Sequence, residues 1–169
     1  MDEPTFIDSR KEMEQILREE VLGYLGLAGE EQPYVVPLNY AYAAGKILFH
    51  CALTGQKLDA MRRNPCVCFT VGRQTGEVRD HAGSPCHTDS DSVICYGRAR
   101  IFDDPAERAA VLNAFNRRYR PEAPDLPQER VEQCTAVEIT ITEMTGRQER
   151  DRQRTYWRST FWPVALENS

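Results

Sequence analysis

The segment PYVVPLNYAYAAGKILFHCALTGQKLDAMRRNP, residues 33–65, decides the fold. Its first twenty residues form two β-rich runs around an Ala-Ala-Gly-Lys turn, which predicts a β-hairpin over residues 33–52. Pro37 cannot donate a hydrogen bond to a neighbouring strand, so we expect the first run at a sheet edge. The remaining residues predict a corner and then a short helix over residues 55–65, which Pro65 ends.

The corner at residues 54–57 admits two interpretations. The free N–H groups at a helix start attract phosphate, Gly55 lets a ligand approach the backbone, Thr54 can donate a hydroxyl and Lys57 adds positive charge. The same residues are typical of an ordinary helix start, with Thr54 as the N-cap and Lys57 in solvent. On these residues alone, a phosphate site and a plain turn both remain open.

Two further helices are predicted outside this segment. Residues 9–22 carry apolar side chains at a 3.6-residue period behind a capping box formed by Ser9 and Glu12. Residues 103–120 show the same periodicity and begin at Asp104, a favourable N-cap residue followed by proline. We therefore expect one N-terminal helix and one helix in the second half of the chain, besides the short helix after the corner.

More strands are predicted from apolar or alternating runs, at residues 23–29, 66–72, 91–102 and 135–146. The polar residues 73–91 are expected to form a long loop. Short connections favour antiparallel pairing, and the lack of regular strand–helix alternation argues against a doubly wound sheet. We predict a mainly β fold with peripheral helices in a single domain over residues 1–169, with a core at about 9–146 and a tail at 147–169.

The composition and the sequence argue against nucleic acid and membranes as binding partners. The chain carries a formal net charge of −5, whereas nucleic-acid-binding proteins usually present a basic surface. No apolar run is long enough to span a membrane, and the acidic, polar N-terminus is unlike a signal peptide, so we expect a cytoplasmic protein. Several of the six cysteines lie in apolar strands, which indicates free thiols rather than disulfides.

A metal site is the alternative use of the polar segment 73–91. It contains His81, Cys86 and His87, which are possible zinc ligands. Their H-x4-C-H spacing has no second ligand pair at the separation of a tetrahedral site, so no metal is predicted. The segment is expected instead to shape the substrate entrance or a dimer edge.

The motifs of the chain, taken together, closely resemble the FMN-binding split-barrel family related to pyridoxamine 5′-phosphate oxidase, and most of all its nitroimidazole-resistance branch. The pattern is P-x-V-V-P-L-N-Y-x-Y, G-K-I-x-F-H-x-A, G-x-K-L-D-x4-N-P-x-V-C-F and S-V-I-x-x-G-x-A, in this order. The resemblance covers about residues 9–145. It implies an antiparallel split β-barrel with an N-terminal helix and two further helices.

The resemblance also implies an FMN site. The strand Val36–Tyr40 would lie along the flavin ring, the strand end His50–Ala52 near the ring and ribityl chain, and the helix start at the phosphate. Ser92 would add a polar side chain from the facing strand or from the other subunit. The implied cofactor residues are Val36, Pro37, Leu38, Asn39, Tyr40, His50, Cys51, Ala52, Thr54, Gln56, Lys57 and Ser92.

Two positions of this implied site need separate comment. The oxidase branch has an Arg where this chain has Gln56, so part of the phosphate charge is expected to be met by Arg62, Arg63 or Arg73. His50 matches a residue on the substrate side of the flavin and is the implied catalytic residue, because histidine can relay a proton near neutral pH. The alternative for His50 is a rim histidine satisfied by a hydrogen bond.

The leading hypothesis is an FMN-dependent oxidoreductase, a homodimer with FMN at the interface, that reduces a small electrophile such as a nitroaromatic. An external reductant such as NAD(P)H, or a small oxidisable acid, is expected to load the flavin. NAD(P)H would bind transiently, because no dinucleotide fingerprint is seen in the sequence. Two alternatives stay open. One is a flavin- or haem-binding module without turnover, and the other is a pyridoxamine 5′-phosphate oxidase proper.

Overall fold

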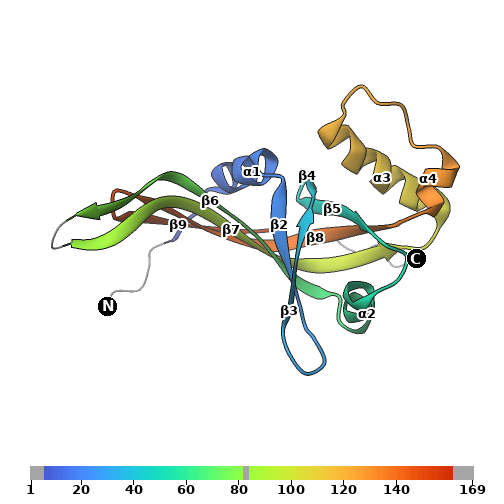
Figure 1. The fold of residues 1–169 in the computed structure, drawn as a ribbon, viewed down its shortest axis with the longest axis horizontal. Coiled ribbons are helices and arrows are strands. Elements are labelled where there is room, and N and C mark those ends of the chain that lie inside the picture. The colour runs from blue at the N-terminus through green and yellow to red at the C-terminus, as the bar shows by residue number, and fades with distance from the viewer. Residues whose placement is uncertain (1–5, 82–83, 162–169) are drawn as a thin grey trace.

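The computed structural model describes the backbone of residues 6–81 and 84–161, and the side chains of these ranges outside residues 77–87. In this part of the chain, a nine-stranded sheet forms the body and four helices pack around it (Figure 1). The strands are β1 (Phe6–Ile7), β2 (Leu22–Leu27), β3 (Tyr34–Asn39), β4 (Ala41–Ala43), β5 (Lys46–Cys51), β6 (Cys66–His81), β7 (Ser84–Phe102), β8 (Thr135–Arg150) and β9 (Gln153–Thr160). The helices are α1 (Arg10–Glu19), α2 (Gln56–Arg63), α3 (Pro105–Tyr119) and α4 (Gln128–Glu132).

The sheet runs in the order β1-β9-β8-β7-β6-β2-β3, with antiparallel pairing at each step except the short parallel pair β1–β9. One edge of β8 pairs with β7, while its other edge pairs first with β5 and then with β9. β4 lies beside β5. Within the described residues the two ends of this order do not pair, so the sheet stays open. The predicted mainly β, antiparallel architecture is confirmed.

The hairpin predicted over residues 33–52 is correct only in its second half. β4 and β5 form it around Ala44 and Gly45, whose φ angles are both positive, at 47° and 81°. β3 pairs with β2 instead and has no second neighbour among the described strands. Pro37 lies in β3, so its predicted edge position is confirmed.

The expectation of a loop over residues 73–91 is wrong. β6 and β7 continue through this segment as a long antiparallel hairpin, and with β8 and β9 they form the arm that extends to the left in Figure 1. The arm reaches beyond the main core, so polar residues suit both of its faces and the usual apolar alternation of a strand is lost. The side chains considered as metal ligands, His81, Cys86 and His87, lie outside the described ones.

Asp91 anchors the base of this arm. Its buried carboxylate accepts hydrogen bonds from Arg73 Nε at 3.0 Å and Arg150 Nη2 at 2.9 Å, and Arg73 also pairs with Glu19 at the end of α1. Burial alone would raise the pKa of the Asp91 carboxyl, but the two guanidinium groups hold it below its usual value. The charge of Arg73 is therefore already paired at the base of the arm, with Asp91 and with Glu19 of α1.

The helices follow the sequence prediction in type more closely than in length. α3 begins as expected, because Asp104 Oδ1 accepts from the N–H groups of Ala106 and Glu107, both at 3.0 Å. α1 ends at Glu19, three residues before the predicted boundary at residue 22, because the chain turns there into β2. α4 is a helix the sequence did not predict, since five residues are too few to show a helical period.

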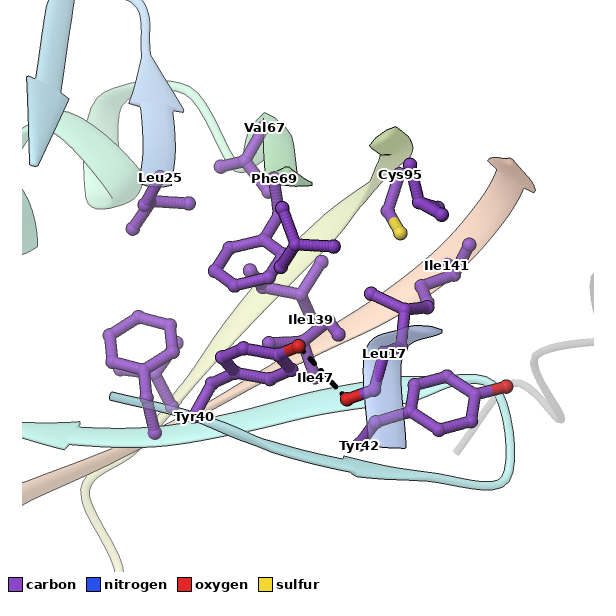
Figure 2. Close-up of a cluster of buried hydrophobic side chains, with 14 of the residues drawn as sticks. Leu17, Leu25, Tyr40, Tyr42, Ile47, Val67, Phe69, Cys95, Ile139 and Ile141 are labelled. Atoms are coloured by element: carbon purple, nitrogen blue, oxygen red, sulfur yellow. Dashed lines mark hydrogen bonds between the residues drawn. The ribbon is translucent and has the colours of Figure 1, made fainter. Parts of the chain in front are cut away.

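The core has two parts, on opposite faces of β5. In the larger part, Tyr40 packs edge-on against Phe69 with ring centroids 4.8 Å apart, and its hydroxyl donates to the Leu17 carbonyl of α1 at 2.9 Å (Figure 2). In the smaller part, Leu48 of β5 packs under α3 against Leu112. Successive residues of β5 thus alternate between the main core and the α3 face.

Two expectations from composition can be compared with the structure. In the part of the chain that is described, no helix is long and apolar enough to cross a membrane. The cysteines with described side chains are free thiols, as predicted, and they are Cys51, Cys66, Cys68, Cys95 and Cys134.

Candidate functional site

The start of α2 retains the properties of an anion site. Gly55 is its N-cap, with φ at 135°, and no side chain caps the helix. Thr54 is therefore not the N-cap, which is the role that the plain-turn interpretation gave it. A Cβ built on Gly55 would meet no atom within 4 Å, so the space in front of the helix is open. In the described part of the chain, the backbone N–H groups of Gln56 and Lys57 have no hydrogen-bond partner, whereas that of Leu58 donates to the Gly55 carbonyl at 2.9 Å.

Lys57 supplies the positive charge at this corner. It is half-buried in the first turn of α2 and has no carboxylate partner in the described part of the chain. Arg63 of the same helix pairs with Glu30 at 3.0 Å, and Arg62 lies 3.7 Å from Asp103. Lys57 is therefore the cation of α2 that is free to pair with an anionic ligand.

Gln56 lies beside a polar cavity of about 570 Å³ between α2 and the loop that joins β2 to β3. Glu30, Glu31 and Asp59 line this cavity together with Arg63. The charge of Arg63 is already balanced by Glu30. Arg63 could therefore compensate only in part for the Arg that the resemblance implies where this chain has Gln56.

His50 lies at the end of β5 on the face toward α3. Its ring packs edge-on against Phe115, with ring centroids 4.9 Å apart, and the side chain is otherwise exposed. Partial burial lowers the pKa of His50, and the nearby charge of Lys57 lowers it further. The ring nitrogens have no hydrogen-bond partner in the part of the chain that is described. The protein hydrogen bond that the rim-histidine interpretation requires is therefore not found within the described residues.

β3 offers an unpaired strand edge. Val36 and Leu38 pack against the core, whereas Pro37 and Asn39 are exposed. Because β3 pairs only with β2 among the described strands, alternate N–H and C=O groups point away from the sheet. Such groups can bond to a planar ligand that has polar atoms along one edge.

The corner after β3 is held from two sides. Its residue Tyr40 bonds α1 through its hydroxyl, and its carbonyl accepts a hydrogen bond from the Tyr119 hydroxyl of α3 at 2.6 Å. Asn39, the last residue of β3, is exposed beside this corner. Phe115 and Tyr119 are one helical turn apart, with ring centroids 5.1 Å apart, so α3 contacts both His50 and the end of β3.

The helix over residues 103–120 was predicted, but Phe115 and Tyr119 were not singled out as candidate site residues. Phe115 is only partly buried, and Tyr119 is exposed. The signal that could have found them is an aromatic pair at i and i+4, which lies on one face of a helix and can contact a single neighbouring strand.

The remaining predicted cofactor residues differ in position. Ala52 and Thr54 are exposed between β5 and α2, close to the corner. Cys51 faces the core, where burial raises its pKa, so it can contact a ligand only through its backbone. Ser92 lies on β7 opposite Gly72, and β6 and β2 separate β7 from β3. One chain therefore does not bring Ser92 to the other candidate residues.

An exposed apolar surface covers the outer face of the sheet. We call it the outer-face patch, and its residues are Leu22, Tyr24, Val35, Cys68 and Tyr96. A shallow groove of about 640 Å³ runs across it between β2, β6 and β7. Val35 is 60% exposed. Contiguous exposed apolar surface of this kind marks an interaction site.

Comparison with known proteins identifies a family whose model the sequence matches. Residues 9–148 match the family model described as pyridoxamine 5′-phosphate oxidase. An uncharacterized protein of Rhizobium meliloti is 36% identical over 63 residues, which are 37% of this chain and 41% of that protein. The chain thus matches less than half the length of this curated relative.

Solved structures show the same fold. A candidate 5-nitroimidazole antibiotic resistance protein from Bacteroides thetaiotaomicron is 24% identical, with a TM-score of 0.73 over 84% of this chain and 85% of that chain. An FAD-binding protein from Mesorhizobium loti is 25% identical, with a TM-score of 0.62 over 84% and 96%. An FAD- and haem-binding protein from Mycobacterium smegmatis is 15% identical, with a TM-score of 0.71 over 80% and 67%. These structures confirm the split-barrel fold that the resemblance implied.

Proposed function

The chain belongs to the pyridoxamine 5′-phosphate oxidase family, and on this premise we propose that it is an FMN-binding oxidoreductase. The observation that carries the proposal is the open start of α2. An uncapped helix start, the open space at Gly55 and the unpaired Lys57 suit a phosphate group. The capped start of α3 shows that the same chain can close a helix N-terminus where no ligand is required.

The residues near this corner suit the rest of a flavin. The N–H groups at Gln56 and Lys57 would hold the phosphate, and the free edge of β3 would bond the polar edge of the ring. Thr54 and the backbone at Cys51–Ala52 would line the chain between them. FMN, when bound, would supply the hydride transfer, and the protein would orient the ring, admit the substrate and provide a group for proton transfer.

His50 is the proposed catalytic residue. Its lowered pKa keeps the ring neutral at pH 7, and its unpaired nitrogens can accept a proton from water or pass one to a substrate. A small electrophile such as a nitroaromatic is the proposed substrate, with NAD(P)H as a transient reductant. The exposed aromatic edge formed by His50 and Phe115 suits a planar substrate.

A homodimer completes this proposal. The outer-face patch is apolar and exposed, and covering it with a second copy would remove its apolar surface from water. Ser92 lies away from the corner in its own chain, so its proposed contact with the cofactor requires a second copy. The flavin site would then lie at the interface between the two copies.

FAD is the second candidate cofactor, because the polar cavity beside Gln56 adjoins the proposed phosphate site. Acidic side chains such as Glu30 and Glu31 could accept hydrogen bonds from the hydroxyl groups of a second nucleotide. The FAD-binding protein of Mesorhizobium loti has the same fold. The FMN site itself is unchanged in this alternative.

An absorbance spectrum of the purified protein, followed by thermal unfolding with added FMN, FAD or haemin, tests the proposal. We expect flavin absorbance bands or a rise in melting temperature with a flavin. Bound ligand raises the stability of the folded state by RT ln(1 + [L]/Kd), so even a weakly retained flavin would be detected. A Soret band, or no response to either flavin, would contradict the proposal.

A further inference from the structure

The imidazole of His50 is held by packing rather than by a hydrogen bond. Its ring lies edge-on against the Phe115 ring, with centroids 4.9 Å apart and an angle of 86° between the ring planes. Within the described part of the chain, Phe115 is the one ring that contacts it, and its nitrogens have no hydrogen-bond partner. A histidine that moves a proton must keep one ring orientation, which a third group usually sets by bonding one of its nitrogens. Phe115 is the side chain placed to set the orientation here.

The register of the sheet brings His50 to the face under α3. His50 pairs with Ala136 of β8, which pairs in turn with Phe102 of β7. Directly paired residues of antiparallel strands carry their side chains on the same face. Ala136 and Phe102 both belong to the smaller part of the core, as does Leu48 two residues before His50. The backbone therefore directs His50 toward α3, where its ring meets Phe115.

Helix α3 gives Phe115 a fixed position. Asn113, buried in the middle of the helix, accepts a hydrogen bond from the backbone N–H of Leu126 at 2.8 Å. At the last residue of the helix, the Tyr119 hydroxyl donates to the Tyr40 carbonyl at 2.6 Å. Phe115 lies between these two tethers, partly buried against the smaller part of the core. The second tether joins α3 to the corner after β3, so it fixes Phe115 relative to the free strand edge.

We propose that Phe115 is the positioning residue of His50. Its ring holds the imidazole in one orientation at the end of β5 and leaves both ring nitrogens available for proton transfer. Without this contact, an exposed histidine side chain would populate several staggered rotamers, and only a fraction of molecules would present the ring correctly. The use of this orientation in a reaction rests on the proposed function, whereas the packing of the ring does not.

Three variants separate this role from general stability. Phe115→Leu removes the ring and keeps an apolar side chain, and Phe115→Tyr keeps the ring and should behave as wild type. Phe102→Leu is the matched control, because Phe102 belongs to the same part of the core and lies two strands from His50 in the sheet. It has no ring contact with His50 in the described residues.

Ring mobility in flavin-free protein tests the packing itself. Carbon-13 relaxation of the histidine ring C–H groups reports motion on the picosecond-to-nanosecond scale, and His50→Asn identifies the His50 signal among the three histidines. The His50 ring should have an order parameter near the rigid value of about 0.85 in wild type, Phe115→Tyr and Phe102→Leu. In Phe115→Leu it should fall below about 0.6. Equal order in wild type and Phe115→Leu would overturn the inference, whether or not the protein binds a flavin.

Reoxidation of the reduced, FMN-loaded protein by a nitroimidazole tests the consequence for the reaction. Phe115→Leu should lower the maximal rate about tenfold or more, because a misplaced general acid or base loses much of its effect. The half-saturating nitroimidazole concentration and the FMN affinity should stay within about twofold of wild type, a difference of less than about 0.5 kcal/mol. A higher half-saturating concentration at an unchanged rate would show direct substrate binding by Phe115 and overturn the positioning role.

A double-mutant cycle shows whether Phe115 acts through His50. In a His50→Asn background, Phe115→Leu should cause no further loss of rate, because the group that it positions is already absent. Fully additive losses would contradict the inference and leave the proposed function standing. If wild type binds no flavin, the proposed function fails, and the relaxation measurement still decides whether Phe115 holds the ring.

Discussion

Two side chains of the candidate site have no protein partner for their charge or hydrogen bonds in the described part of the chain. In the described part of the chain, Lys57 has no carboxylate partner and His50 has no hydrogen-bond partner. Charged residues elsewhere are mostly satisfied, as Arg63 is by Glu30 and Asp91 is by two arginines. An unpaired cation and an unpaired histidine beside one open helix start indicate a ligand site more strongly than either residue does alone.

His50 should make the wild-type protein less stable in mildly acidic solution than at neutral pH. Replacing His50 by Asn should remove this loss of stability. His50 titrates near 6.5 in the unfolded chain, and burial and Lys57 lower its pKa in the folded protein. Below about pH 6.5 the unfolded state therefore binds more protons, and the folded state loses stability until the pH falls below the folded pKa.

Urea unfolding of wild type and His50→Asn at about pH 7.5 and about pH 5.5 measures this effect. The free energy of unfolding of wild type should fall more between these pH values than that of the variant. His81 and His87 are present in both proteins, so the difference isolates His50. Identical pH dependence in the two proteins would show that His50 is fully solvated.

At the scale of the element, the starts of α2 and α3 differ in a way that follows from their sequences. Asp104 can cap α3 because its carboxylate accepts from two backbone N–H groups. Gly55 has no side chain to cap α2, and its φ of 135° is a conformation that other residues rarely adopt. A side chain caps the start of α3, whereas the starts of α1, α2 and α4 have no side-chain cap. What distinguishes the start of α2, where the phosphate is proposed to bind, is the open space at Gly55 together with Lys57.

Replacing Asp104 by Ala should destabilise the protein by about 1 kcal/mol, the usual effect of losing an N-cap. Asp103 is the matched control, because it is exposed and its ion pair with Arg62, at 3.7 Å, is loose. Asp103→Ala should change stability by less than about 0.5 kcal/mol. Chemical denaturation measures both values, and equal effects of the two substitutions would contradict the capping role.

The sequence predicted elements well where one face is buried, and poorly where it is not. The alternation of β8 and the periodicity of α1 and α3 reflect burial on one side, and these elements were found. Residues 73–91 lack this signal because the arm reaches beyond the main core, and at its base Asp91 pairs with Arg73 and Arg150 rather than facing apolar side chains. A strand was therefore taken for a loop. The pairing of β3 with β2 joins segments whose order in the sheet no local sequence pattern contains.

The candidate site was predicted in the same uneven way. The residues of the corner and of β3 were taken from motif order along the chain. The structure places the charge of Lys57 near His50 and links His50 to the end of β3 through Phe115 and Tyr119 of α3. Phe115 and Tyr119 were missed because they are distant in sequence and resemble ordinary core residues. Their position depends on how α3 packs across β5.

At the scale of the whole molecule, the open sheet leaves an apolar face that one chain does not cover. The outer-face patch spans β2, β3, β6 and β7 on the side of the sheet away from the main core. Ser92 is separated from β3 by β6 and β2. Both facts are explained if two copies pack face to face and build the cofactor site between them.

Val35→Glu tests this arrangement. Val35 is 60% exposed in the single chain, so a charge there should leave the fold intact while preventing an apolar contact between copies. Sedimentation should show a dimer for wild type and a monomer for Val35→Glu, with weaker FMN binding in the variant. A wild-type monomer at micromolar concentration that still binds FMN would contradict the interface.

The phosphate site at α2 is tested most directly by titrating flavin-free protein with FMN and with riboflavin, which lacks the phosphate. Wild type and Lys57→Gln are compared with Lys46→Gln, whose lysine pairs with Glu138 on β8. Wild type and the control should bind FMN at least about tenfold more tightly than riboflavin, since a charge-assisted phosphate contact is lost with riboflavin. Lys57→Gln should lose most of this preference while binding riboflavin within about twofold of wild type. Equal affinity of wild type for both flavins, or an unchanged preference in Lys57→Gln, would contradict a phosphate site at the start of α2.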